Sequence, residues 1–206
     1  MIVRRLCRAW KERGPIGLMR HVVRRAIPVH VSMVYRKTER SSACAVPGLL
    51  TERYRARSAV GPNIISKLQM TRGPELIREL DKLFAKGCEL WLGWIEGEIA
   101  GICWSRGHKN RTDYFVALEE DDATILSCFV FPQYRGRGVY PTMLETIVRT
   151  LMDHDQVSNV YVDCKSWNVP SIRGIQKAGF SLIGSAVRMV LCGRVWILRN
   201  RCRTTQ

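Results

Sequence analysis

Apolar residues recur with two different spacings along most of the chain. Alternation at every second residue indicates a β-strand, whereas apolar residues three or four positions apart indicate an amphipathic helix. Strands are predicted at 49–58, 124–131, 159–164, 185–191 and 195–199, and a hairpin at 89–105 around Glu96-Gly97-Glu98. Two helices are predicted between residues 58 and 87, the second at 75–86, and further helices at 138–153 and 169–177. Strands and helices alternate in the second half, which predicts a mixed α/β fold with at least one parallel strand pair.

The first 30 residues have a different pattern, in which apolar residues interleave with arginines. At helical spacing this pattern predicts two short amphipathic helices with basic faces, separated at Gly14-Pro15. Residues 1–60 contain 14 Lys and Arg against three acidic residues, a net charge of +11 out of the +15 of the whole chain. Most of the positive charge is therefore assigned to an N-terminal arm.

The polar, Pro- and Gly-terminated segment 38–48 predicts where this arm ends. We expect a basic amphipathic arm at 1–45 and a folded domain at 46–206. Four roles are open for the arm: docking on the domain, contact of residues 1–30 with an anionic membrane surface, binding to a protein, or binding to nucleic acid. No aromatic-rich nucleic-acid motif is present, so nucleic acid is not an expected partner.

Composition narrows the class of protein further. A chain of 206 residues with 46% hydrophobic content is long and apolar enough for one compact domain with an appendage. The eight cysteines lie at irregular separations with no zinc-ligand spacing, which indicates reduced thiols and no metal. No apolar run reaches the roughly 18 to 20 residues of a membrane span. We expect a cytoplasmic protein, at most peripheral to the inner face of the membrane.

The segment that carries chemistry is the loop Gln133–Gly138 between a predicted strand and a predicted helix. Its glycines let backbone N–H groups approach a ligand closely, and the first turn of the helix offers unpaired donors at a positive dipole end. Arg135 and Arg137 add positive charge. The arrangement predicts a pyrophosphate site, although the loop matches neither the P-loop nor the dinucleotide-binding motif.

This loop and a second motif together resemble the GNAT superfamily of acyl-CoA-dependent N-acetyltransferases. QYRGRG at 133–138 is similar to the signature [Gln/Arg]-x-x-Gly-x-[Gly/Ala] of that family. Further along, Asn168-Val169-Pro170-Ser171 with Lys177-Ala178-Gly179-Phe180 resembles the second motif, Asn-x-x-[Ala/Ser] leading to Lys-x-Gly-Phe. The resemblance covers about residues 49–192. It implies a GNAT-type fold with a central V-shaped mixed β-sheet flanked by helices, in which strands 124–131 and 159–164 splay apart.

The resemblance also implies a binding site for acetyl-CoA or another acyl-CoA. The pantetheine arm would pair with the backbone of Val130 and its neighbours Phe129 and Phe131. The pyrophosphate would bind the amides of Gln133, Tyr134, Arg135, Gly136, Arg137, Gly138, Val139 and Tyr140. Asn168 and Ser171 would contact the cofactor from the opposite wall.

The catalytic residues are less clear, because Ile175 stands where many members of the family have a tyrosine general acid. Tyr140 and Tyr134 are candidate substitutes, and Ser171 or water is an alternative proton source. Asp163, on a strand beside the cleft, is the preferred candidate base over the turn residues Glu96 and Glu98. A backbone N–H at the splay, on Val130, would stabilise the oxyanion.

The leading functional hypothesis is N-acylation of a small amine, such as an amino sugar or amino-acid derivative. Acylation of a protein amino group is an alternative, and so is a catalytically idle module tethered to a membrane or a protein. We expect acceptor specificity to reside in the loop at 106–123, since acceptor pockets in such folds are built from variable loops. The sequence leaves a homodimer open.

Overall fold

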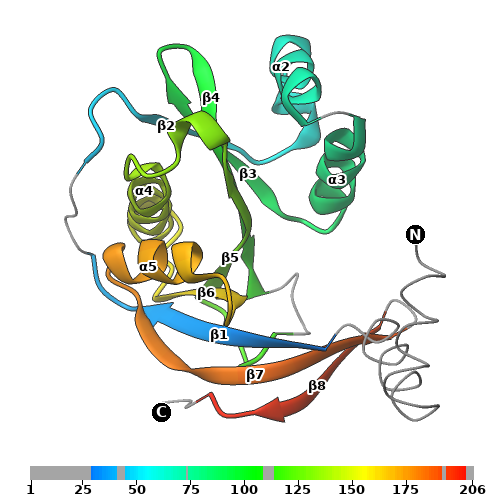
Figure 1. The fold of residues 1–206 in the computed structure, drawn as a ribbon, viewed down its shortest axis with the longest axis vertical. Helices are drawn as coiled ribbons and strands as arrows, with labels where there is room; N and C mark the ends of the chain where they lie inside the picture. Colours follow the sequence, from blue (N-terminus) through cyan, green and yellow to red (C-terminus); the bar gives the residue numbers. More distant parts are fainter. Residues whose placement is uncertain (1–28, 41–44, 73, 109–113, 192–193, 203–206) are drawn as a thin grey trace, which may run out of the picture.

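The computed structural model describes residues 29–40, 45–72, 74–108, 114–191 and 194–202, which form one mixed sheet with helices on both faces (Figure 1). The strands are β1 (Val29–Lys37), β2 (Leu50–Tyr54), β3 (Glu89–Ile95), β4 (Glu98–Gly107), β5 (Asp122–Val130), β6 (Asn159–Lys165), β7 (Ser181–Leu191) and β8 (Arg194–Asn200). The helices are α2 (Pro62–Arg72), α3 (Pro74–Ala85), α4 (Val139–His154) and α5 (Val169–Lys177), with 3-10 turns at Arg57–Ala59 and Pro132–Tyr134. The predicted hairpin, helices and C-terminal strand pair are confirmed.

The eight strands are arranged in the order β2-β3-β4-β5-β6-β1-β7-β8. β5 and β6 run parallel, and the strand pairs on either side of them are antiparallel. This arrangement confirms the mixed sheet and the parallel pair that the sequence predicts. The two predicted arm helices lie within residues 1–28, outside the described residues.

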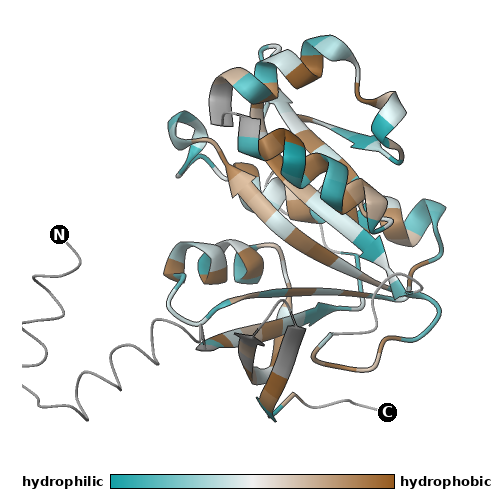
Figure 2. Ribbon diagram, turned by 90° about the vertical axis from the view of Figure 1, so that its right-hand side faces the viewer, coloured by the Kyte–Doolittle hydropathy of each residue, from teal (hydrophilic) through white to brown (hydrophobic). Residues whose placement is uncertain are grey.

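Three apolar clusters hold the layers together. α4 and α5 pack on one face of the sheet through residues such as Leu144, Ile147 and Ile175. α2 and α3 cover the other face along β3 and β4, where Leu80 and Trp104 are buried. Figure 2 shows apolar and polar positions alternating along these helices, as expected for helices that each bury one side.

β1 lies inside the sheet although its residues precede the predicted domain boundary. It is hydrogen-bonded to β6 on one side and to β7 on the other. Val34 and Tyr35 are 0% and 1% exposed, one on each face. The boundary predicted at residue 45 is therefore wrong for residues 29–37, because these residues complete the core instead of forming an appendage.

A buried lysine connects this strand to α5. Lys37 is 4% exposed, and its ammonium donates a hydrogen bond to the carbonyl of Ala178, the C-cap residue of the helix. The same ammonium lies 5.8 Å from the centre of the Phe180 ring. Burial lowers the pKa of Lys37, and the nearby Glu145 carboxylate opposes that effect. A cation at a helix C-terminus is electrostatically favourable, so β1 also fixes the position of α5.

The loop at 106–123 contributes to the core as well. Tyr114, Phe115 and Val116 are buried against Val34 and Tyr161 on the face of the sheet opposite α5. The described part of this loop therefore acts as a cover for the sheet, and its predicted role in acceptor specificity stays a prediction.

The five described cysteines, Cys88, Cys103, Cys128, Cys164 and Cys202, are free thiols. None of the helices within the described ranges is long and apolar enough to cross a membrane.

Candidate functional site

The central strands separate along their length. β5 and β6 are paired only between Asp122–Ile125 and Asn159–Val162, so the later part of β5 has no partner on its β6 side. On its other side β5 remains paired with β4, with an irregularity between Ile102 and Trp104. Opposite that irregularity Ser127 has a φ of 47°, a left-handed conformation typical of a bulge. This geometry confirms the splay that the family resemblance implies.

The backbone of Val130 faces into the splay. The amide of the next residue, Phe131, donates to the carbonyl of Ala100 in β4. Because successive backbone groups of a strand point to opposite edges, the N–H and C=O of Val130 point away from β4. The Val130 carbonyl accepts a hydrogen bond of 3.0 Å from Nε of Arg135, whose guanidinium lies over the Phe129 ring.

The loop after β5 leads directly into α4. Gly136 and Gly138 have φ values of 76° and 82°, a conformation that residues with a side chain rarely adopt. Gly138 is the N-cap residue, and no side chain caps the helix. The first amides of α4 are therefore free of a side-chain acceptor at the end where the helix dipole favours an anion.

These elements enclose a cavity of about 790 Å³ between the end of β5 and the N-terminal halves of α4 and α5. Most of the predicted cofactor-binding residues line it: Phe129, Val130, Tyr134, Arg135, Gly136, Gly138, Val139, Tyr140, Asn168 and Ser171. Three predicted residues do not. Phe131 is buried against the α2 and α3 side, whereas Gln133 and Arg137 are exposed and do not belong to the lining.

Several lining residues were not predicted from the sequence. They are Cys128, Pro141, Val169, Pro170, Arg173, Gly174 and Lys177. Arg173 and Lys177 are exposed and lie four residues apart on α5. The sequence contains a signal that could have identified them. Two basic residues at i, i+4 spacing lie on a helix whose first turn faces the glycine-rich loop.

Asn168 has a structural role at the opposite wall. It is the N-cap residue of α5, where its side-chain oxygen accepts a hydrogen bond of 3.4 Å from the amide of Ser171. This contact satisfies one of the free donors of the helix and fixes the turn between β6 and α5. Asn168 lines the cavity while it holds that turn.

Tyr140 lies in the first turn of α4. Its phenol lies near Cys103 of β4, Cys128 of β5 and Cys164 of β6. Its ring packs against Gly174 of α5, where a side-chain methyl would lie 3.0 Å from Cε1 and closer still to Cδ1. Burial raises the pKa of Tyr140 well above its ordinary value, and the nearby thiols of Cys128 and Cys103 act in the same direction. A hydrogen bond with the Ser171 side chain opposes this shift. The phenol is therefore protonated at neutral pH.

The thiols around the splay are poor nucleophiles. Burial, together with contact with Cys128, raises the pKa of Cys103 well above its ordinary value. Burial also raises the pKa of Cys164, although a hydrogen bond with Ser171 opposes the shift. Because the thiolate is the reactive form, neither Cys103 nor Cys164 is activated for covalent catalysis.

Asp163 lies on the other side of the sheet. Val162 and Cys164 pack toward α4 and α5, and strand alternation places Asp163 on the opposite face with Tyr161. Burial raises the pKa of Cys202, which packs at that face, and the Asp163 carboxylate acts in the same direction. The structure therefore does not bring Asp163 into the lining of the cavity. Tyr140 and Asp163 approach the splay from its two faces.

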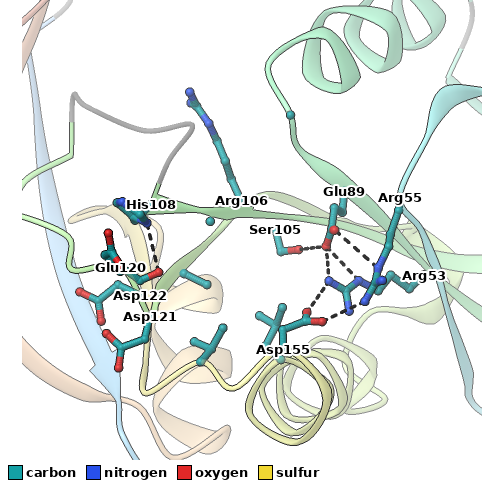
Figure 3. A pocket seen from close by; sticks show the side chains of 15 residues that line it. Arg53, Arg55, Glu89, Ser105, Arg106, His108, Glu120, Asp121, Asp122 and Asp155 are labelled. Carbon is teal, nitrogen blue, oxygen red and sulfur yellow. Dashed lines mark hydrogen bonds and ion pairs between the residues drawn. The ribbon is translucent and has the colours of Figure 1, made fainter.

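A second cavity, of about 430 Å³, lies at the opposite end of β5 (Figure 3). Its wall contains an ion-pair cluster in which Arg53 bridges Glu89 of β3 and Asp155 at the end of α4. The guanidinium also lies 5.1 Å from the centre of the Trp91 ring. Because the carboxylates of this cluster are already paired with arginines, it serves to join β2, β3 and α4. No group of three or more metal-ligating side chains occurs among the residues that the structure describes.

Comparison with known proteins identifies the family. Residues 63–180 match the acetyltransferase (GNAT) family, whereas no curated protein matches the chain. A GNAT-family acetyltransferase from Colwellia psychrerythraea is 16% identical with a TM-score of 0.55, over 79% of this chain and 56% of that one. A GCN5-related N-acetyltransferase from Sphaerobacter thermophilus is 14% identical with a TM-score of 0.53, over 91% of this chain and 58% of that one. The chain thus spans less than two thirds of either structure. Since the family match covers more than half of its length, the chain belongs to the GNAT family of acetyltransferases.

Proposed function

We propose that the protein transfers an acyl group from acyl-CoA to the primary amine of a small molecule. The observation that carries this proposal is the convergence of three features on one cavity: a glycine-rich loop with uncapped amides, the inward-facing backbone of Val130, and the protonated hydroxyl of Tyr140. Acyl transfer from a thioester needs an anion site, an oxyanion donor and a group that assists the leaving thiolate.

The residues that line the cavity support binding of a coenzyme A thioester. The amides from Gly136 to Tyr140 would hold the pyrophosphate at the N-terminus of α4. The exposed cations Arg173 and Lys177 lie on the rim and add charge complementarity. The C=O of Val130 would accept a hydrogen bond from a pantetheine amide once Arg135 releases it, which leaves the N–H of Val130 for the thioester oxygen.

In the reaction the amine nitrogen attacks the thioester carbonyl carbon, and the carbon–sulfur bond then breaks. The N–H of Val130 would donate to the oxygen on which negative charge develops. The amine must lose a proton, and Asp163 is the candidate that receives it from the opposite face of the sheet.

Tyr140 would assist the departing sulfur. A free thiol has a pKa of about 8.5, which lies below that of a tyrosine, so a complete proton transfer from the phenol is unfavourable. Tyr140 would therefore stabilise the thiolate as a hydrogen-bond donor, oriented by the side chain of Ser171. This role replaces that of the missing tyrosine at Ile175, which is fully buried in the core.

Calorimetric titration with acetyl-CoA and longer acyl-CoAs tests the proposal. Gly136→Asp should abolish binding, because it places a carboxylate beside the pyrophosphate. Gly97→Asp is the matched control, since Gly97 and Gly136 have φ values of 75° and 76° and neither has an atom within 4 Å of an added Cβ. The control carries the same backbone strain and charge in the β3–β4 turn, away from the cavity.

Micromolar binding that is lost in Gly136→Asp and kept in Gly97→Asp would support the proposal and justify a screen of amines for release of free CoA. If the wild-type protein fails to bind, or if Gly136→Asp binds equally well, the proposed cofactor site is wrong.

A further inference from the structure

The charge of this protein is divided between two parts of the chain. Residues 1–38 contain ten Lys and Arg and one acidic residue, and residues 164–206 contain eight Lys and Arg and no acidic residue. The 125 residues between them contain 15 basic and 17 acidic residues, a net charge of −2. The two ends of the chain together carry a net charge of +17, which exceeds the +15 of the whole chain.

The fold brings these two ends together. β1 comes from the first segment and lies between β6 and β7, and β8 follows at the edge of the sheet. α5 packs beside them, as the blue, orange and red elements of Figure 1 show. We call this part of the molecule, formed by β1, α5, β7 and β8 with the turn at 165–168, the basic lobe.

The basic lobe also carries most of the exposed apolar surface. Among the described residues eight large apolar side chains are exposed, and six of them belong to this lobe: Val31, Trp167, Val169, Leu182, Ile197 and Leu198. The most exposed of the six is Trp167, at 70%, and the ammonium of Lys165 lies 5.4 Å from the centre of its ring. An aromatic side chain combined with a lysine on a solvent-facing turn is typical of groups that sit at a lipid headgroup boundary.

Part of this surface lies on one face of the sheet. Val31, Val187 and Arg199 lie directly opposite one another across β1, β7 and β8, so their side chains project from the same side of the sheet. Strand alternation places Val31 on the side of Met33 and Tyr35, which pack with α5. The amide of Ser166 donates to the carbonyl of Val31, which places Trp167 next to this row. We call this side of the basic lobe, together with the neighbouring Lys165–Trp167 pair, the docking face.

We propose that the docking face binds the surface of an anionic lipid bilayer. The chain that precedes β1 joins it at Val29, two residues from Val31, and its 28 residues contain eight basic residues and one acidic residue. A segment with an apolar and basic sequence pattern thus directly precedes the strand that contributes Val31 to the docking face. Both complement a surface that offers phosphate groups above an apolar layer.

A bilayer explains the pattern better than a nucleic acid does. A phosphate polymer would account for the cations alone. It would not account for exposed Val31 and Leu182 beside them, since exposed aliphatic side chains gain free energy from burial in lipid.

Co-sedimentation of the full chain with vesicles tests this inference, using phosphatidylcholine alone and phosphatidylcholine with about a third of phosphatidylglycerol. The protein should bind the anionic vesicles and bind neutral ones weakly. Since each basic residue near such a surface contributes roughly a fivefold factor, Lys165→Glu/Arg199→Glu should reduce partitioning at least about twentyfold. Trp167→Ser should reduce it independently of ionic strength, because its contribution is apolar.

Matched controls lie outside the basic lobe. Lys86→Glu reverses an exposed charge next to α3, and Met70→Ser removes an apolar side chain that is 89% exposed on α2. Both should leave vesicle binding unchanged, and the thermal unfolding transition checks that every variant is folded. Because the assay measures partitioning alone, it does not depend on the proposed catalytic activity.

Three results would overturn the inference. One is equal partitioning of the wild-type protein and both docking-face variants. Another is an equal loss in the control variants, which would indicate a general charge effect. The third is tight binding to duplex DNA that is unaffected by Trp167→Ser, combined with weak vesicle binding, because this would assign the cations to a nucleic acid.

Discussion

At the scale of single residues, the candidate site depends on one contact between α4 and α5. Ile175 is fully buried in the core, and the ring of Tyr140 in α4 packs closely on α5 because Gly174 has no side chain. The sequence could identify the loop residues Gly136 and Gly138, since their motif is local. It could not identify Gly174, whose role arises only from the packing of α4 on α5.

Tyr140→Phe should lower kcat about ten- to a hundredfold, because the departing thiolate loses its hydrogen-bond donor. KM for acyl-CoA should change little, since the phenol acts on charge that develops during the reaction. The group works in its protonated form, and its folded-state pKa is raised above 10. The wild-type rate should therefore show no loss from this group between pH 8 and 10. Steady-state rates of CoA release across that range measure both effects.

Gly174→Ala should give a similar loss of kcat by displacing the Tyr140 ring. In an ordinary helix interior this substitution stabilises a protein by up to about 1 kcal/mol, so a Gly174 without a tight contact to Tyr140 predicts higher stability and normal activity. In the Tyr140→Phe background the effect of Gly174→Ala on kcat should nearly disappear, because both changes remove the same interaction. Additive losses in the double variant would contradict this role for Gly174.

At the scale of elements, the sequence predicts most helices and strands because each has its own local period. β1 is the exception. Its residues alternate weakly, since a strand between two others buries both faces, and the arginines on either side dominate the local pattern. The ion-pair cluster around Arg53 also has no local signal, because its partners lie 36 and 102 residues away.

Replacing Arg53 should weaken the attachment of α4 to β2 and β3, which the sheet itself does not provide. Its side chain is 14% exposed, and its Nε donates a 2.9 Å hydrogen bond to Glu89. Burial would lower the pKa of this guanidinium, but hydrogen bonds to Asp155 and Glu89 outweigh that effect and raise it. Arg53→Ala leaves two partly buried carboxylates facing each other, which should cost about 2 kcal/mol of unfolding free energy after allowance for solvent screening.

Urea denaturation measures this cost. Arg55→Ala is the matched control, because Arg55 pairs with the same Asp155 but is 63% exposed, and it should cost less than about 0.5 kcal/mol. Equal midpoints for Arg53→Ala and the wild-type protein would show that the cluster does not stabilise the junction of β2, β3 and α4.

At the scale of the whole molecule, the fold joins the two ends of the chain into one part of the sheet. In the sheet β1 separates β6 from β7. Without residues 29–37 one edge of β6 would therefore have no partner strand. The same strand contributes Val31 to the docking face. Residues 29–37 therefore complete the core and connect it to the docking face, two roles that the position of these residues in the sequence does not indicate.

Two truncations separate these roles. Deleting residues 1–28 keeps β1 and should leave cooperative unfolding and acyl-CoA binding close to those of the full chain. Deleting residues 1–45 removes a strand hydrogen-bonded on both sides, together with the buried side chains of Val34, Tyr35 and Lys37. Loss of even two such apolar side chains costs about 4 to 10 kcal/mol, which is comparable to the total stability of a domain. The longer deletion should therefore yield protein without a cooperative thermal transition, and a normal Tm for it would show that β1 is dispensable and that the core ends at β6.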